Sequence, residues 1–196
     1  MITDWLRGGP FLELSFIIEE ERLLTDLFES IRQASTGVVE IHHEEERMAE
    51  FNNGNLYDDA DPNGLTMHQT CLKLTIHTVR TRRGLLFVER IHDRLLCLCI
   101  CVYGSEFDAD EWEQPGIRED ELPEFDRLLR ELHTEFRFLI GGIAFEEDVK
   151  CFFDTQQPWP HPDYSIENIT ADRIASRKEA FRQLMISERL GGVPDL

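Results

Sequence analysis

The sequence predicts a single α+β domain over residues 1–196, with amphipathic helices packed on an antiparallel or mixed β-sheet. Between residues 71 and 104, three β-type runs follow one another with turn-length gaps, as in an antiparallel meander. Residues 122–136 carry apolar side chains at helical spacing. The predicted order is β, α, β, loop, three strands, α, β, α, which is not the strict alternation of a parallel α/β sheet.

The first segments predict a strand, a helix and a second strand. Residues 11–18 (FLELSFII) are typical of a strand, and residues 24–31 repeat apolar side chains at helical spacing. Residues 37–43 (GVVEIHH) are rich in β-branched side chains and predict the next strand. The polar, turn-rich stretch that continues to residue 64 predicts a short helix or an extended loop.

The first run of the meander, residues 71–79 (CLKLTIHTV), alternates apolar and polar side chains. We expect one buried face and a second face, with Lys73, Thr75 and His77, that meets solvent or a partner. This second face makes a homo-oligomer a possible arrangement.

Turns at 81–84 (TRRG) and 92–93 (HD) are expected to separate that run from strands at 85–91 and 94–104. The last of these runs is apolar on both faces, which predicts a central strand.

The second half of the chain predicts a polar acidic loop at 105–121 and then the helix at 122–136. A last strand is expected within 138–148, where paired glycines indicate a bend or a close backbone approach. A proline-rich connection at 156–164 leads to a C-terminal helix near 167–189.

The charge of the chain bears on its partners. The 39 Asp and Glu outnumber the 20 Lys and Arg, which gives a formal net charge of −19. A field of that sign repels nucleic acid and anionic lipid and attracts cationic surfaces, so we expect a basic protein partner and no nucleic acid. Solubility alone is the other explanation of such acidity.

The chain shows no secretory signal and no uncharged stretch of the roughly 18 residues that a membrane helix needs. Its five cysteines are an odd number in apolar surroundings, which favours reduced thiols. We therefore expect a cytoplasmic protein that is not in a membrane.

The stretch DDADPNG (58–64) resembles the opening of a calcium-binding loop. From Asp59, the residues at positions 3, 5 and 6 fit that loop, but Thr70 occupies position 12, where a bidentate carboxylate is required. We interpret the stretch as a structural turn.

The stretch CLCIC places Cys97, Cys99 and Cys101 on one face of a strand. Residues two apart on a strand are about 6.6 Å apart, whereas two thiolates on one zinc ion are at most about 4.6 Å apart. We therefore expect small buried side chains rather than a metal site.

Other catalytic signatures are incomplete. His43 and Glu44 begin a His-Glu-x-x-His motif, but Arg47 replaces the second histidine. Ser105 lacks the flanking glycines of a nucleophile elbow. No phosphate-binding or dinucleotide-binding glycine pattern is present, so no cofactor is expected.

The acidic loop at 105–121 is the best candidate for a binding surface. It carries eight acidic residues against one arginine, together with two aromatic side chains. An aromatic anchor ringed by charge is typical of a surface that steers and holds a basic partner. The candidate partner-binding residues are Phe107, Asp108, Asp110, Glu111, Trp112 and Glu113, with Asp58, Asp59 and Asp61 as a possible extension of the acidic field.

We therefore expect a non-enzymatic protein that binds, and inhibits, a basic partner. In size, acidity and lack of catalytic motifs, the chain is similar to the small acidic α+β immunity proteins that bacteria keep against nuclease-type toxins. One alternative is a metal-assisted hydrolase with ligands from separated segments, for which the candidates are His42, His77, Asp59 and Asp61. Another is an oligomer subunit without catalysis.

Overall fold

The computed structural model describes residues 5–42, 45–54, 68–92, 94–138, 140–146 and 149. They form a single α+β domain built on an antiparallel six-stranded sheet of strand order β2-β3-β4-β5-β1-β6. The predicted fold class is confirmed. The predicted proline-rich connection and C-terminal helix lie outside the described residues.

The elements follow one another in the predicted order. The strands are β1 (Phe11–Glu19), β2 (Val39–Ile41), β3 (His68–His77), β4 (Thr81–His92), β5 (Leu95–Tyr103) and β6 (Ile140–Phe145). The helices are α1 (Leu24–Ala34), α2 (Glu45–Asn52) and α3 (Leu122–Phe136), with the short 3₁₀ helices η2 (Asp110–Trp112) and η3 (Glu119–Glu121) before α3. None of the helices in this part of the chain has the length and apolar character needed to cross a membrane.

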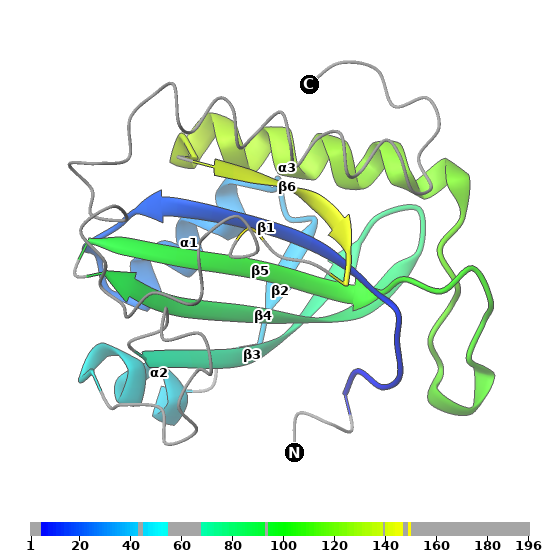
Figure 1. Cartoon of the computed structure of the whole chain (residues 1–196), viewed down its shortest axis with the longest axis horizontal. Coiled ribbons are helices and arrows are strands. Elements are labelled where there is room, and N and C mark those ends of the chain that lie inside the picture. Colours follow the sequence, from blue (N-terminus) through cyan, green and yellow to red (C-terminus); the bar gives the residue numbers. More distant parts are fainter. Residues whose placement is uncertain are drawn as a thin grey trace, which may run out of the picture.

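The main core lies between the sheet and its helices, of which α1 and α3 are behind the sheet in Figure 1. Alternate side chains of β1 and β5, such as Leu14 and Ile100, point into this core and meet the apolar faces of α1 and α3. The helical spacing predicted both apolar faces, since Leu27 of α1 and Leu128 of α3 are buried.

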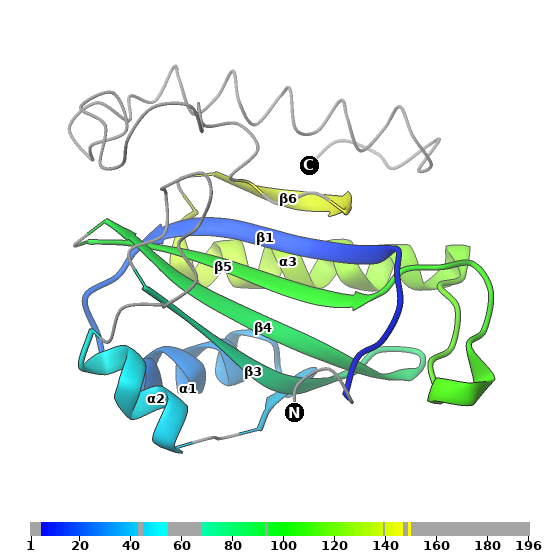
Figure 2. The same cartoon turned by 60° about the horizontal axis from the view of Figure 1, so that its bottom comes forward.

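Strand β5 is central, as its two-sided apolar pattern predicted, and all of its residues are buried. It pairs with β4 on one side and with β1 on the other. Strand β6 pairs with β1, and the predicted close approach occurs there (Figure 2). A Cβ on Gly141 would lie 2.8 Å from atoms of both Phe16 and Phe138, so a larger residue would push these elements apart.

The predicted turn at 81–84 is wrong. These residues begin β4, and the bend between β3 and β4 is at 78–80. Two non-local interactions place residues 81–84 in the strand rather than in a turn. Arg82 is buried in an ion pair described below, and Gly84 is required because a Cβ there would lie 2.8 Å from the carbonyl oxygen of Cys101.

A second, smaller apolar cluster covers the opposite face of the sheet at one end. It is formed by Leu6, Leu85, Cys99, Cys101, Tyr103 and Ala109, with Trp5, Phe11, Cys71, Phe87 and Trp112 packed against it. The N-terminal segment from residue 5 and the acidic loop therefore both pack on this face.

Candidate functional site

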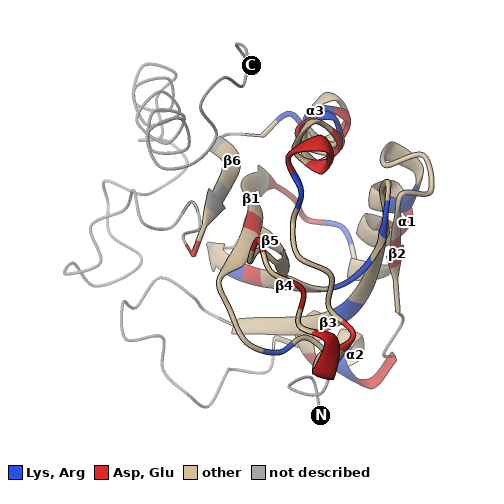
Figure 3. Ribbon diagram, turned by 90° about the vertical axis from the view of Figure 1, so that its right-hand side faces the viewer, with Lys and Arg blue, Asp and Glu red and all other residues tan. Residues whose placement is uncertain are grey.

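The acidic loop, residues 105–121, joins the end of β5 to the start of α3. It includes η2 and η3, and Figure 3 shows acidic residues in both of these short helices on the same side of the molecule. The sequence predicted a loop here, and the structure shows how its backbone is held.

Arg82 of β4 is the main anchor of the acidic loop. Its Nε and Nη2 donate to the two carboxylate oxygens of Glu121 at 3.0 and 2.5 Å. Its Nη1 and Nη2 also donate to the carbonyl oxygens of Pro115 and Gly116 at 2.5 and 2.9 Å. Both charged side chains are buried, so each offsets the charge of the other in the protein interior.

A second attachment joins the loop to the N-terminal segment. Gln114, which is buried, accepts a hydrogen bond from the backbone N–H of Arg7 and donates one to the Arg7 carbonyl, each at 2.7 Å. The loop also closes on itself, because Asp108 accepts hydrogen bonds from the N–H of Gly116 and from the Arg118 guanidinium. A Cβ on Gly116 would lie 2.6 Å from the carbonyl oxygen of Glu106, so this closure needs glycine.

Besides Asp108, two more of the predicted partner-binding residues make internal contacts. The Trp112 ring is half-buried and packs against Gly8, where a Cβ would lie 2.6 Å from the ring. Glu113 pairs with Arg83 of β4 at 2.6 Å and has a left-handed backbone conformation with φ of 54°. Both side chains therefore contribute to the shape of the loop.

The predicted residues that the loop exposes are Phe107, Asp108, Asp110, Glu111 and Glu113, and of their carboxylates those of Asp108 and Glu113 form ion pairs. Phe107 is 78% exposed, more than any other large hydrophobic residue in the described ranges. Asp110 and Glu111 are exposed, and within those ranges neither forms an ion pair. Asp58, Asp59 and Asp61 lie outside the described residues, so the structure does not place them against the loop.

The arginines near the loop are engaged by its own acids. Arg82, Arg83 and Arg118 pair with Glu121, Glu113 and Asp108, respectively. Within the loop, the carboxylates of Asp110, Glu111, Glu119 and Asp120 are exposed and form no ion pair in the described part of the chain. They give the exposed surface of the loop a negative charge.

The histidines proposed as metal ligands make other contacts. His42 is 2.9 Å from the Thr75 hydroxyl, and its ring meets Trp5 edge-on. His77 is 3.2 Å from a carboxylate oxygen of Glu40. Within the described ranges, neither histidine belongs to a group of three side chains close enough to share an ion.

The polar face of β3 is less open than its sequence pattern suggested. Lys73 and Thr75 are half-buried, and the Lys73 Nζ lies 5.8 Å from the centre of the Trp5 ring. The Trp5 indole N–H donates to the carbonyl oxygens of Leu74 and Gly84 at 3.2 and 2.9 Å. The N-terminal segment thus covers part of the face that the sequence left open to a partner.

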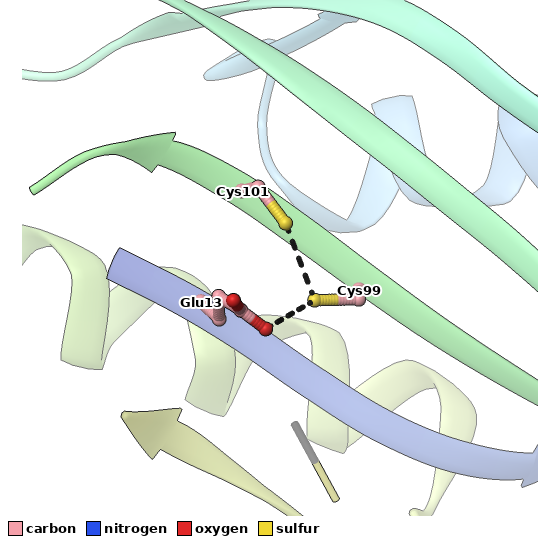
Figure 4. Close-up of side chains that lie close together, drawn as sticks. All are labelled: Glu13, Cys99 and Cys101. Atoms are coloured by element: carbon pink, nitrogen blue, oxygen red, sulfur yellow. Dashed lines mark hydrogen bonds between the residues drawn. The ribbon is translucent and has the colours of Figure 1, made fainter. Parts of the chain in front are cut away.

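The expected separation of the strand cysteines is also wrong for one pair. The Cys99 and Cys101 Sγ atoms are 3.5 Å apart, and Cys99 Sγ is 3.4 Å from Glu13 Oε2 (Figure 4). The distance of about 6.6 Å applies to successive Cα atoms on one face of a strand, whereas side chains also lean along the strand. Here the two sulfur atoms lean toward each other.

Strand pairing brings the Glu13 carboxylate close to these two sulfur atoms. Glu13 of β1 is directly opposite Cys101 of β5, and Cys99 is its diagonal neighbour. One ligand atom from each of the three side chains lies within 4.8 Å of the other two. We call Glu13, Cys99 and Cys101 the thiol cluster.

The environment keeps the Cys99 thiol protonated. The hydrogen bond with Cys101, and then burial, raise the pKa of Cys99 well above its ordinary value. A thiol of this kind is a poor nucleophile at neutral pH, because the thiolate is the reactive form. Cys99 therefore does not have the properties of a cysteine nucleophile.

Sequence reasoning missed the contributions of Arg82, Gln114 and Glu13. Arg82 looked like part of a turn, and no local pattern marks Gln114 as buried. Glu13 alternates with buried leucines in β1, but the sequence does not determine which β5 residue faces it.

Comparison of the chain with known protein families, with curated proteins and with solved structures found no match.

Proposed function

We propose that the protein binds and inhibits a basic protein of the nuclease type through the acidic loop. The observation that carries this proposal is the 78% exposure of Phe107 beside the exposed carboxylates of Asp110 and Glu111. An aromatic side chain can fill a pocket on the partner, while the surrounding charge steers the approach and disfavours acidic partners.

The way the loop is held supports binding without a large ordering cost. Hydrogen bonds from Arg82 and Gln114 fix its backbone after η2, and the Asp108 carboxylate, which accepts from the Gly116 N–H, ties the segment before η2 to the segment after it. A surface that is already ordered before binding loses less conformational entropy when the partner docks. Trp112 contributes to this order by packing on Gly8.

A nuclease is a physically reasonable target, because a site that binds the phosphate backbone of nucleic acid must be positively charged. The net charge of −19 and the acidic loop would complement such a site. The proposal places the protein in a reducing cytoplasm, and the four cysteines of the described ranges are free thiols, in accord with that setting.

The proposal can be tested by immobilising the full chain and capturing proteins from a lysate of its source at low salt and near 0.5 M salt, where charges are screened beyond about 4 Å. Captured proteins are identified, purified and titrated against the wild type and two variants. A basic protein bound more tightly at low salt is expected. Phe107→Ala should weaken its binding by about 30-fold or more.

The charge variant Asp110→Asn/Glu111→Gln should slow association, and this effect should shrink at high salt. The matched control is Glu50→Gln/Glu135→Gln, which removes two exposed carboxylates outside the loop. Nuclease activity of the partner, measured with and without the protein, tests the inhibitory part. Binding that is indifferent to salt, or equally affected by both charge variants, would contradict the proposal.

A further inference from the structure

We infer that Glu13, Cys99 and Cys101 form a zinc-binding site on the face of the sheet opposite the helices. Two thiolates and a carboxylate are a donor set that suits Zn²⁺, since soft sulfur ligands select zinc over magnesium or calcium. The site is separate from the exposed surface of the acidic loop, and the inference does not depend on the proposed function.

Two of the three distances between the ligand atoms are close to those of tetrahedral coordination. With Zn–S of about 2.3 Å and Zn–O of about 2.1 Å, two sulfurs on one ion are about 3.8 Å apart, and a sulfur and an oxygen are about 3.6 Å apart. The thiol cluster has 3.5 Å between its sulfurs and 3.4 Å between Cys99 Sγ and Glu13 Oε2. The Cys101 sulfur and the nearest Glu13 oxygen are within 4.8 Å, so an ion needs these two side chains to approach each other by up to about 1.2 Å.

The three side chains come from a rigid part of the fold. Glu13 is paired with Cys101 across two adjacent strands, and β5 is the buried central strand. Figure 4 shows the carboxylate and both thiols pointing toward one another from β1 and β5. Ligands on paired strands are held in place before the ion arrives, which lowers the cost of assembling the site.

Burial and access are also suitable. Cys99 and Cys101 are 3% and 6% exposed, and they pack with Leu6, Leu85 and Ala109 in the second apolar cluster. Glu13 is half-buried, so solvent and an incoming ion approach from its side. On binding, each thiol releases its proton to solvent, and water is the natural fourth ligand of a site with three protein ligands.

The test uses the full chain, stripped with a chelator under reducing conditions and titrated with Co²⁺, which reports thiolate ligation by a charge-transfer absorption band. The wild type should bind one Co²⁺ with an intensity typical of two thiolates, and Zn²⁺ should displace it. Zn²⁺ should also raise the melting temperature, because a ligand that binds only the folded state stabilises it.

Two serine variants separate the cluster from cysteine content in general. Cys97 and Cys101 are both buried and both two residues from Cys99, but only Cys101 belongs to the thiol cluster. Cys101→Ser should reduce the charge-transfer band to that of one thiolate and weaken binding, whereas Cys97→Ser should leave both unchanged. Circular dichroism establishes that each variant is folded.

Glu13→Gln should keep the two-thiolate band and weaken Co²⁺ binding by about tenfold or more, since even residues that only support metal ligands change affinity by this much. A folded wild type that gives no charge-transfer band would overturn the inference. So would a band that Cys97→Ser removes and Cys101→Ser retains. Partner capture by the acidic loop can succeed or fail independently of either result.

Discussion

Arg82 and Glu121, which are 39 residues apart, form a buried bidentate ion pair between β4 and η3. The same guanidinium holds the carbonyl oxygens of Pro115 and Gly116, so one side chain fixes the return of the acidic loop toward α3. A buried pair of this kind costs a great deal to break, because the remaining charge stays in the protein interior without its partner.

Glu121→Gln should therefore lower the free energy of unfolding by about 3–5 kcal/mol. The matched control is Glu124→Gln, which breaks the more exposed Glu124–Arg127 pair of α3 and should cost at most about 1 kcal/mol. Urea unfolding of the three proteins measures both effects. Equal losses in the two variants would show that the buried pair does not hold the loop.

Gly8→Ala should disturb the packing of Trp112. Gly8 has a φ of 67°, and an added Cβ would lie 2.6 Å from the Trp112 ring. Gly37→Ala is the control, because Gly37 has a φ of 80° but has open space around it. In both variants, an alanine held in a left-handed backbone conformation should lower the free energy of unfolding by about 1–2 kcal/mol.

Only Gly8→Ala should lower the free energy of unfolding by more than this backbone cost. It should also change the near-ultraviolet circular dichroism of tryptophan. In the capture experiment it should also weaken binding, since the loop would be less ordered. If the spectra of the two variants match that of the wild type, the contact between Trp112 and Gly8 does not shape the loop.

Cys99 should react slowly with iodoacetamide in the native, metal-free protein at neutral pH. The hydrogen bond with Cys101 and burial raise the pKa of its thiol, so very little thiolate is present. Cys71, which is half-buried, should be alkylated before Cys99. Timed labelling followed by peptide mass spectrometry measures the order. Labelling of Cys99 as fast as Cys71 would contradict the described environment of the cluster.

His68 should make the stability of the protein depend on pH. Burial, and then the positive charge of Arg90 opposite it in the sheet, lower the pKa of His68 in the folded state. As the pH falls below the ordinary histidine pKa of about 6.5, the unfolded chain takes up a proton that the folded chain does not. The free energy of unfolding therefore falls until the pH is below the folded-state pKa.

His68→Gln should remove this part of the pH dependence, which urea unfolding at several pH values between about 5 and 8 can measure. Nuclear magnetic resonance titration of the His68 ring gives the folded-state pKa directly. A value at or above that of an ordinary histidine would be inconsistent with the contacts that His68 makes with Phe51 and Arg90.

Much of the fold follows from local sequence patterns. The spacing of Leu27 and Leu128 with their neighbours predicted both long helices, and the continuous apolar run of β5 predicted the central strand. These predictions succeeded because side-chain periodicity is a local property that decides which face of an element is buried. The acidic loop was also recognised, from its composition alone.

The tertiary structure decided which residues give the loop and the cluster their properties. Arg82 looked like a turn residue because its partner Glu121 lies far along the chain, and the burial of Gln114 depends on the N-terminal segment reaching Arg7. The thiol cluster depends on the pairing of Glu13 with Cys101 and on the direction in which each sulfur leans. Strand pairing and side-chain rotamers are set by packing between distant segments, so a pattern of neighbouring residues does not determine them.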